Sequence, residues 1–279
     1  MNPDICITIL IDNATTGTGL GSEHGLSLWI EYKGKKILFD TGQSNLLIQN
    51  AEKLDIDLSK TNAIVLSHGH HDHTGGLIGV LNYAPRAHVY FNHKAIEAKY
   101  SCKNGGPRYI GIQEQIKQQL VHKFKFGEAT CTNNKTLIFN GAAVTGQVPR
   151  RNDYEDTGGY FYNDKACTCI DSLVDDQSLF FECPKGLVVI LGCSHSGVVN
   201  TLDYISELTD QKKIYAAIGG MHMVNAGTQR IEKTISAFRK YDIQKIVPLH
   251  CTGLEAMEKI KEEFAERCLL LGAGDKICF

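Results

Sequence analysis

The segment 68–73, with the sequence HGHHDH, constrains this chain more than any other, because it holds four histidines and one carboxylate in six residues. It follows directly on the run 62–67 (NAIVLS), which is typical of a short buried strand. In an extended chain the side chains alternate between faces, so His68 and His70 point the same way, and Gly69 leaves room between them. We interpret the segment as a metal site rather than as a polar loop that is rich in histidine by chance.

The second half of the segment supplies further donors. Past a turn, Asp72 and His73 can approach from a second direction and hold a second ion. His71 falls on the opposite face, and we interpret it as a bystander.

Length and charge exclude several classes of protein. The chain has 279 residues, a net charge of −2 and 22% charged residues, so no overall field favours nucleic acid or an anionic membrane as a partner. No stretch approaches the roughly 18 apolar residues that a membrane span needs. The N-terminus has no basic patch followed by an apolar run, which argues against a signal peptide. We expect a cytoplasmic protein.

The ten cysteines are scattered along the chain rather than spaced as a disulfide framework. A chain of this length can build a core without covalent links, so we expect reduced thiols. Cys167 and Cys169 lack the two-residue spacer of a redox or zinc pair, and no second pair accompanies them.

Short β-type runs alternate with helical patterns along the chain. Strands are predicted over 5–12, 26–32, 36–41, 63–66, 88–91, 136–140, 178–183, 187–191, 215–218, 245–248 and 269–271. Helices are predicted over 44–54, 77–81, 93–100, 112–121, 198–208, 229–241 and 254–267. No linker rich in Pro, Gly or Ser divides the halves. The pattern predicts an α/β fold in one domain, 1–279, with two sheets packed face to face and helices outside. The segment 101–128 is harder to assign, and we interpret it as an insertion near the cleft.

Three more histidines lie just beyond short buried strands. His195 follows the apolar run 186–191, His222 follows 215–221, and His250 follows 245–249. Loops at strand ends are where ligands usually bind, and this placement matches that of His68. We therefore expect these histidines to converge on one site.

Imidazole together with carboxylate suits zinc, and also iron or manganese. Two such divalent ions can share a hydroxide whose pKa is drawn down towards roughly 7. The same ions can bind the oxygens of a phosphate or carbonyl and stabilise the charge that develops in the transition state.

The segment 68–73 resembles the signature of the metallo-β-lactamase superfamily, and 38–42 (LFDTG) resembles its first motif. The chain is most similar to a subgroup described as dihydropterin-ribofuranosylaminobenzene 5′-phosphate synthases. The phrases that carry this similarity are 23–27, 38–42, 66–77, 144–146, 175–177, 192–197, 219–222 and 250–253. The resemblance implies a four-layer αββα sandwich and two divalent metal ions, with zinc as the first choice.

The resemblance also implies a ligand set. His68, His70, Asp72, His73 and His250 match metal ligands, and Asp40 matches an aspartate that orients the cluster without touching metal.

Two departures from the superfamily pattern are visible. No histidine lies near 144–146, where the superfamily usually supplies one, and Gly192 is followed by Cys193 rather than by a bridging aspartate. His195 is our candidate for the missing ligand. Cys193 is interpreted either as a thiolate bridge or as an inert buried thiol.

Other polar residues are candidate substrate contacts. Arg150 and Arg151 form an adjacent pair suited to phosphate or carboxylate, although such pairs also occur as solvated surface. His24 and His222 are candidate proton donors or substrate ligands, and we count Asp72 with them among the catalytic residues.

Three functions remain open. The resemblance implies a metal-dependent enzyme that acts on a phosphorylated small molecule and joins a dihydropterin pyrophosphate to a ribofuranosylaminobenzene phosphate. The alternative is a hydrolase of phosphoesters or other esters that uses metal-bound hydroxide. The third is a non-catalytic metal-binding or sensing protein. The net charge and the lack of a basic arm disfavour RNA processing.

Overall fold

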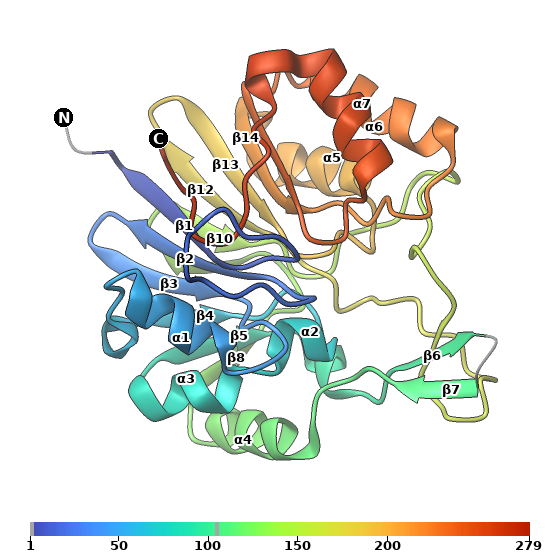
Figure 1. The fold of residues 1–279 in the computed structure, drawn as a ribbon. Coiled ribbons are helices and arrows are strands. Elements are labelled where there is room, and N and C mark those ends of the chain that lie inside the picture. The colour runs from blue at the N-terminus through green and yellow to red at the C-terminus, as the bar shows by residue number, and fades with distance from the viewer. Residues whose placement is uncertain (1–2, 104–105) are drawn as a thin grey trace.

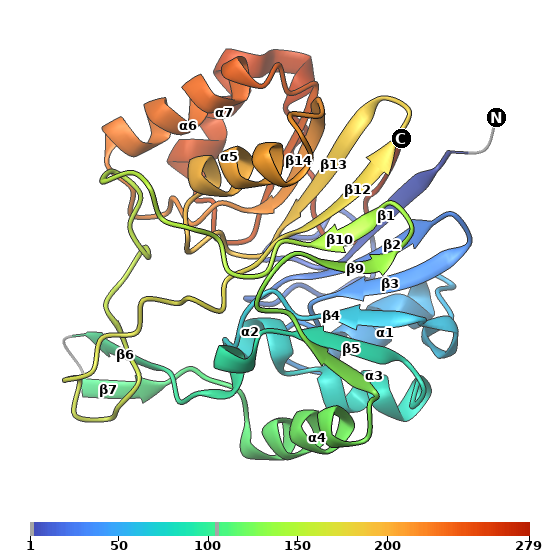
Figure 2. The same cartoon turned by 180° about the vertical axis from the view of Figure 1, so that it is seen from behind.

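Two β-sheets pack face to face, and helices cover both outer faces (Figures 1 and 2). The computed structural model describes residues 3–103 and 106–279. The predicted four-layer αββα arrangement is confirmed.

The first sheet has the strand order β16-β1-β2-β3-β4-β5-β8. From β3 onward its neighbours run parallel, so the carboxyl ends of these strands lie at one edge. The strands are β1 (Ile5–Ile11), β2 (Ser27–Tyr32), β3 (Lys35–Phe39), β4 (Ala63–Val65), β5 (His88–Phe91), β8 (Ala129–Cys131) and β16 (Lys276–Cys278).

The second sheet has the order β15-β14-β13-β12-β10-β9, and β13, β14 and β15 run parallel. Its strands are β9 (Thr136–Phe139), β10 (Ala142–Val144), β12 (Leu179–Cys183), β13 (Gly186–Leu191), β14 (Ile214–Gly220) and β15 (Lys245–Leu249).

Alternation along the strands divides the apolar residues among three cores. In β13, Val188 and Ile190 face the core between the sheets, whereas Leu187, Val189 and Leu191 face the outer helices. A strand buried on both faces has to read as a continuous apolar run, which is why the sequence of β13 is so apolar.

The helices on the first sheet are α1 (Leu46–Lys53), α3 (Leu77–Tyr83) and α4 (Glu114–Lys125), and those on the second are α5 (Val198–Leu208), α6 (Thr228–Lys240) and α7 (Leu254–Phe264). The short helix α2 (His71–Thr74) and the 3₁₀ turns η1 (Leu58–Lys60), η2 (His93–Ile96) and η3 (Ala265–Arg267) complete the set. Among the described residues, no helix combines the length and apolar character that a membrane crossing requires.

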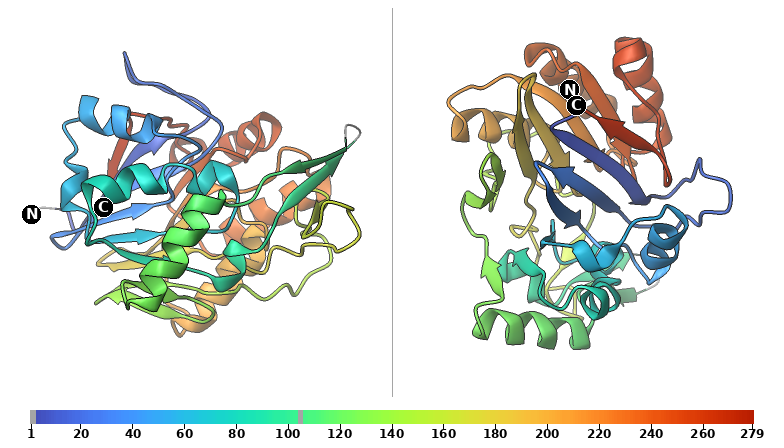
Figure 3. Two further views of the ribbon diagram at one scale, coloured as in Figure 1. Left: turned by 90° about the horizontal axis from the view of Figure 1, so that it is seen from below. Right: turned by 90° about the vertical axis from the view of Figure 1, so that its left-hand side faces the viewer.

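A third, small sheet projects from the body of the molecule (Figure 3). It consists of β6 (Tyr100–Lys103), β7 (Gly106–Tyr109) and β11 (Phe161–Tyr162), in the order β11-β6-β7. The segment 101–128 therefore contains part of this arm together with α4, which packs on the outer face of the first sheet through Ile116 and Leu120.

Two element predictions were wrong. The segment 93–100 forms only the short turn η2 before β6 begins, because β6 pairs with β7 and β11 in a sheet that the local pattern does not reveal. The segment 269–271 is irregular, and the last strand is instead β16, which pairs with β1 at the sheet edge.

The expectation that all cysteines are reduced was also wrong for four of them. Cys6 and Cys278 form a disulfide, as do Cys102 and Cys167. Cys6 and Cys278 are direct partners in the register of β1 and β16, so strand pairing brings together two residues from opposite ends of the chain. Sequence spacing carries no information about this pairing.

Candidate metal centre

The candidate site lies where strands of both sheets end. The parallel strands β13, β14 and β15 are followed by Cys193 and His195, by His222, and by His250, respectively. Because parallel strands end at the same edge, these side chains emerge together beside the segment that follows β4.

The turn after β4 depends on Gly69. A Cβ atom at this position would lie 2.1 Å from the backbone oxygen of Ala95, so any side chain would force the turn to shift. The backbone N–H of Gly69 also donates to Asp175 Oδ2 at 2.7 Å. This close packing fixes the two flanking histidines relative to each other.

His68, His70 and His195 form the first donor group. His68 Nε2 lies 2.9 Å from His70 Nδ1, and one nitrogen from each of the three rings falls within 4.8 Å of the others. All three side chains are buried. Among the described residues, neither the Nε2 atom of His195 nor that of His70 has a hydrogen-bond partner. A buried ring nitrogen without a partner is costly unless a cation takes the lone pair.

Burial lowers the pKa values of His68, His70 and His195 well below the usual histidine value. The rings are therefore neutral, which is the form that binds a metal ion. The Nδ1 atom of His195 donates to the backbone oxygen of Thr157 at 2.8 Å, which leaves the lone pair on Nε2.

Asp72, His73 and His250 form the second donor group. Asp72 Oδ2 lies 3.7 Å from His73 Nε2 and 3.5 Å from His250 Nε2, and the two ring nitrogens are 3.2 Å apart. Both rings donate through Nδ1, His73 to Asp40 and His250 to the side-chain oxygen of Asn13. Their Nε2 atoms thus face each other with lone pairs, an arrangement that needs a cation or a proton between them.

Asp40 lies behind this second group. Its Oδ2 atom accepts from His73 Nδ1 at 2.7 Å, and its other oxygen accepts from the backbone N–H of Ser67. Burial lowers the pKa of His73, but the carboxylates of Asp40 and Asp72 outweigh burial and raise it to about 9. The position therefore favours positive charge, which a divalent cation supplies.

Cys193 lies between the two groups. Its Sγ atom is 3.1 Å from His73 Nε2, and it belongs to a set with His68 and His73 whose donor atoms fall within 4.8 Å of one another. Cys251 Sγ is 3.4 Å away on the other side. Burial raises the pKa of Cys193 well above its usual range, so the thiol ionises here only beside a cation.

A cavity of about 540 Å³ opens onto the second group. His24, His222 and His250 line it, and His24 Nε2 lies 3.2 Å from Asp72 Oδ2. The hydrogen bond to Asp72 raises the pKa of His24 above the usual histidine value. His71 lies at the cavity wall with its Nδ1 atom near the backbone oxygen of Ile110.

The structure separates the two predicted arginines. Arg150 lines a second cavity next to the first, whereas the guanidinium of Arg151 pairs with Glu207 outside both cavities. The backbone N–H of Arg151 donates to Asn200 Oδ1, which directs this residue towards α5. The prediction that Arg151 contacts substrate has no support from this placement.

Sequence reasoning missed the residues that hold the ligands. Asp12 Oδ1 accepts from the backbone N–H of His250 at 2.6 Å. From the sequence, Asp12 was expected only as part of a flexible rim with the loop 14–21. Lys99 is buried and pairs with both Asp171 and Asp175, and Asp175 in turn holds the Gly69 N–H. The sequence around Lys99 gives no local sign that this lysine is buried in an ion-pair network. The segment 175–177, which carries part of the family resemblance, was the one sequence feature that pointed to Asp175.

Comparisons with known proteins agree with this geometry. The family model described as "Metallo-beta-lactamase superfamily" matches residues 20–161. A 7,8-dihydropterin-6-methyl-4-(beta-D-ribofuranosyl)-aminobenzene-5'-phosphate synthase of Methanocaldococcus jannaschii is 30% identical over 281 residues, which cover 98% of this chain and 95% of that protein. An uncharacterized protein of the same organism is 34% identical over 258 residues, covering 92% of this chain and 94% of the relative.

The solved structure of Tm1679, named as a metal-dependent hydrolase of the beta-lactamase superfamily, superposes with a TM-score of 0.82. The two sequences are 32% identical, and the match covers 99% of each chain.

Proposed function

Because the chain belongs to the metallo-β-lactamase superfamily, we propose that it is an enzyme that uses two divalent ions to act on a phosphorylated small molecule. The observation that carries the proposal is the convergence of two buried donor groups. Among the described residues, His70 Nε2 and His195 Nε2 have no hydrogen-bond partner, and the Nε2 atoms of His73 and His250 face each other.

In this proposal the first ion is held by His68, His70 and His195, and the second by Asp72, His73 and His250. Cys193 would be a further ligand as a thiolate, beside His73, and Asp40 orients His73. Zinc suits this mixture of imidazole, carboxylate and sulfur best, with iron or manganese as alternatives.

The bound ions supply positive charge that neutralises a departing or reacting phosphate group. The remaining steps belong to side chains that line the cavity. His24 and His222 are the groups placed to give or take a proton, since both line the cavity beside the donor groups. Asp72 binds the second ion and also accepts from His24, so it couples the ion to that proton donor.

The specific reaction that we propose joins a dihydropterin pyrophosphate to a ribofuranosylaminobenzene phosphate. The amine nitrogen attacks the methylene carbon, the carbon–oxygen bond to pyrophosphate breaks, and the nitrogen gives up its proton to a cavity histidine. The synthase relative, which aligns over nearly the whole chain, supports this choice.

Hydrolysis of a phosphoester or another ester is the second candidate. It is supported by Tm1679, which is named as a metal-dependent hydrolase and matches over 99% of this chain. For that reaction the bound ions would supply an activated water as the nucleophile, and a cavity histidine would protonate the leaving group of the ester.

A paired assay separates these candidates. The purified protein is analysed for bound metals and then incubated with the pterin pyrophosphate and the aminobenzene phosphate, and in parallel with bis(p-nitrophenyl) phosphate. Pyrophosphate release that depends on both pterin and amine supports the synthase, whereas turnover of the diester alone supports the hydrolase. Bound metal without turnover of either would favour a sensing protein. A protein that binds no metal contradicts the whole proposal.

The same assay is applied to the variant His68→Ala, with His71→Ala as its matched control. Both residues lie in the segment 68–73, but only His68 belongs to a donor group. We expect His68→Ala to lose activity and metal, and His71→Ala to keep its metal.

A further inference from the structure

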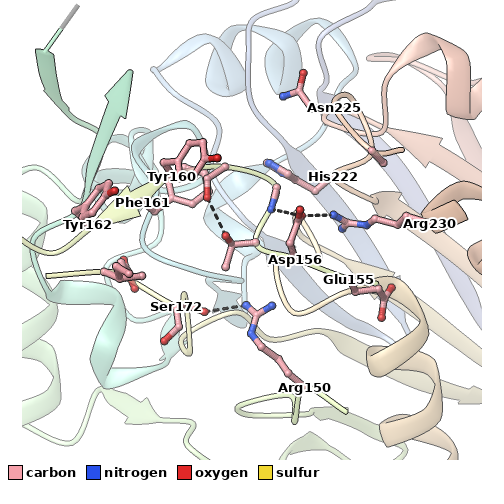
Figure 4. A pocket seen from close by; sticks show the side chains of 16 residues that line it. Arg150, Glu155, Asp156, Tyr160, Phe161, Tyr162, Ser172, His222, Asn225 and Arg230 are labelled. Carbon is pink, nitrogen blue, oxygen red and sulfur yellow. Dashed lines mark hydrogen bonds and ion pairs between the residues drawn. The ribbon is translucent and has the colours of Figure 1, made fainter. Parts of the chain in front are cut away.

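A second cavity of about 650 Å³ adjoins the metal cavity. Gly158, Gly159, Phe161, His222 and Asn225 line both cavities, so the two lie side by side and share this wall. Figure 4 shows the side chains of this second cavity, which we call the arginine pocket.

Arg150 is the accessible cation of the arginine pocket. It is half-buried, and its Nη2 atom donates to the backbone oxygen of Ser172 at 2.8 Å. This bond fixes the direction of the guanidinium (Figure 4). Within the described part of the chain, no carboxylate lies within ion-pair distance of Arg150, so its charge is available to a ligand.

Arg230 enters the same pocket from α6 and is only 4% exposed. Its Nη1 atom donates to Asp156 Oδ1 at 2.7 Å, but Nε and Nη2 have no partner in the part of the chain that the structure describes. These two nitrogens form one edge of the guanidinium, which is the edge that matches the two oxygens of a phosphate. Because they are shielded from water, Arg150 makes the first contact with a ligand, and Arg230 adds its charge from behind.

The carboxylates of the pocket are already engaged. Glu155 accepts the backbone N–H groups of Val199 and Asn200 at the start of α5, and Asp171 accepts from the buried Lys99. Asp156 is the partner of Arg230. Glu155 keeps its negative charge in these bonds, but among the described residues none of the three carboxylates forms an ion pair with Arg150.

An aromatic wall lies between the arginines and the metal ligands. Tyr160, Phe161 and Tyr162 line this side of the pocket (Figure 4). The ring of Phe161 lies 5.2 Å from that of His70 and 5.4 Å from that of His195, measured between centroids. A planar ligand that extends from the metal ligands therefore passes along aromatic faces before it reaches the arginines.

We infer that the arginine pocket binds a phosphate monoester of the substrate that does not react, while the reacting group lies at the metal ligands. The inference rests on the proposed function for the chemistry at the metals. It adds a place for the phosphate of the ribofuranosylaminobenzene phosphate, which lies in the arginine pocket and away from the metal ligands.

The test uses the metal-loaded protein and phenylphosphonate, which carries a ring and an anionic head and cannot be hydrolysed at its carbon–phosphorus bond. Binding is measured by calorimetry for wild type, Arg150→Ala and Arg151→Ala. We expect Arg150→Ala to weaken binding about tenfold or more, the usual effect of losing a hydrogen bond to a charged group. Arg151→Ala is the matched control, because its guanidinium pairs with Glu207 outside the pocket, and it should bind as wild type does.

Two further variants separate the pocket from the metals. Arg230→Gln removes the charge behind Arg150, and its thermal midpoint is measured beside its affinity so that a loss of folding is recognised; we expect weaker binding in a folded protein. His70→Ala, which removes a metal ligand, should still bind phenylphosphonate.

The inference is overturned if wild type does not bind the probe, if Arg150→Ala binds it as wild type does, or if His70→Ala loses binding that Arg150→Ala keeps. The last result would place the phosphonate at the metals. These outcomes are measured by binding alone. The proposed function is tested separately, by metal content and turnover.

Discussion

The Sγ atom of Cys193 lies 3.1 Å from Nε2 of His73, although 120 residues separate them in the chain. The sulfur stands between the two donor groups, at the point where the superfamily pattern leads one to expect a bridging aspartate. A soft thiolate in this position favours zinc or iron over magnesium.

If Cys193 is a bridging ligand, replacing it should remove a sulfur–metal bond. The cobalt-substituted wild type should show a thiolate-to-metal charge-transfer band in the near ultraviolet, and Cys193→Ser should lose most of it. Cys183→Ser is the control, since Cys183 lies on β12 outside both cavities. A band of unchanged intensity in Cys193→Ser would show that the thiol is an inert neighbour.

His195→Ala should weaken the first ion more than Cys193→Ala does. In the proposed arrangement the histidine would supply a neutral Nε2 lone pair to that ion, whereas the sulfur would be shared between two ions. After dialysis against metal-free buffer, metal analysis should find one equivalent fewer in His195→Ala than in wild type, with His71→Ala as the control. Equal and negligible losses in the two variants would refute the assignment of His195.

Asp40→Asn should lower metal affinity by roughly 10–100-fold, the usual cost of changing a group that orients a metal ligand. Asparagine tolerates the left-handed backbone at this position, where φ is 56°, so the fold should survive. Competition with a chromophoric chelator measures the affinity. Asp57→Asn, an exposed aspartate that caps the turn η1, is the control. Unchanged affinity in Asp40→Asn would mean that His73 needs no support from Asp40.

Lys99→Met should lower the free energy of unfolding by about 3–5 kcal/mol, because it leaves the buried carboxylates of Asp171 and Asp175 without their cation. Lys94→Met removes the exposed pair with Glu97 and should cost at most about 1 kcal/mol. Urea unfolding measures both. Similar losses in the two variants would show that the buried network is not a structural support of the site.

The sequence predicted the layers of the fold well, because a strand such as β13, buried on both faces, has to be apolar throughout. It also placed the histidines at strand ends, since a run of apolar residues that stops at a histidine is visible locally. The arm of β6, β7 and β11 was missed, because β11 joins β6 from about 60 residues away and no local pattern announces that pairing.

The direction in which a side chain points was harder to predict than the position of its residue in a strand, helix or loop. Arg150 and Arg151 are adjacent, yet only Arg150 faces the cavity, because the backbone of Arg151 is held by Asn200 on α5. Arg230 lies on the helix that the sequence predicted over 229–241, and only the fold shows that its guanidinium reaches the pocket. In the same way, Asp12 meets His250 only after β1 and β15 have been placed.

The most direct test of the account is a crystal structure of the metal-loaded protein, with anomalous scattering recorded on both sides of the metal absorption edge. The account predicts two anomalous peaks, one within bonding distance of His68, His70 and His195, and the other within bonding distance of Asp72, His73 and His250. Peaks that leave His195 and His250 uncoordinated, or no peak in this cavity at all, would contradict it.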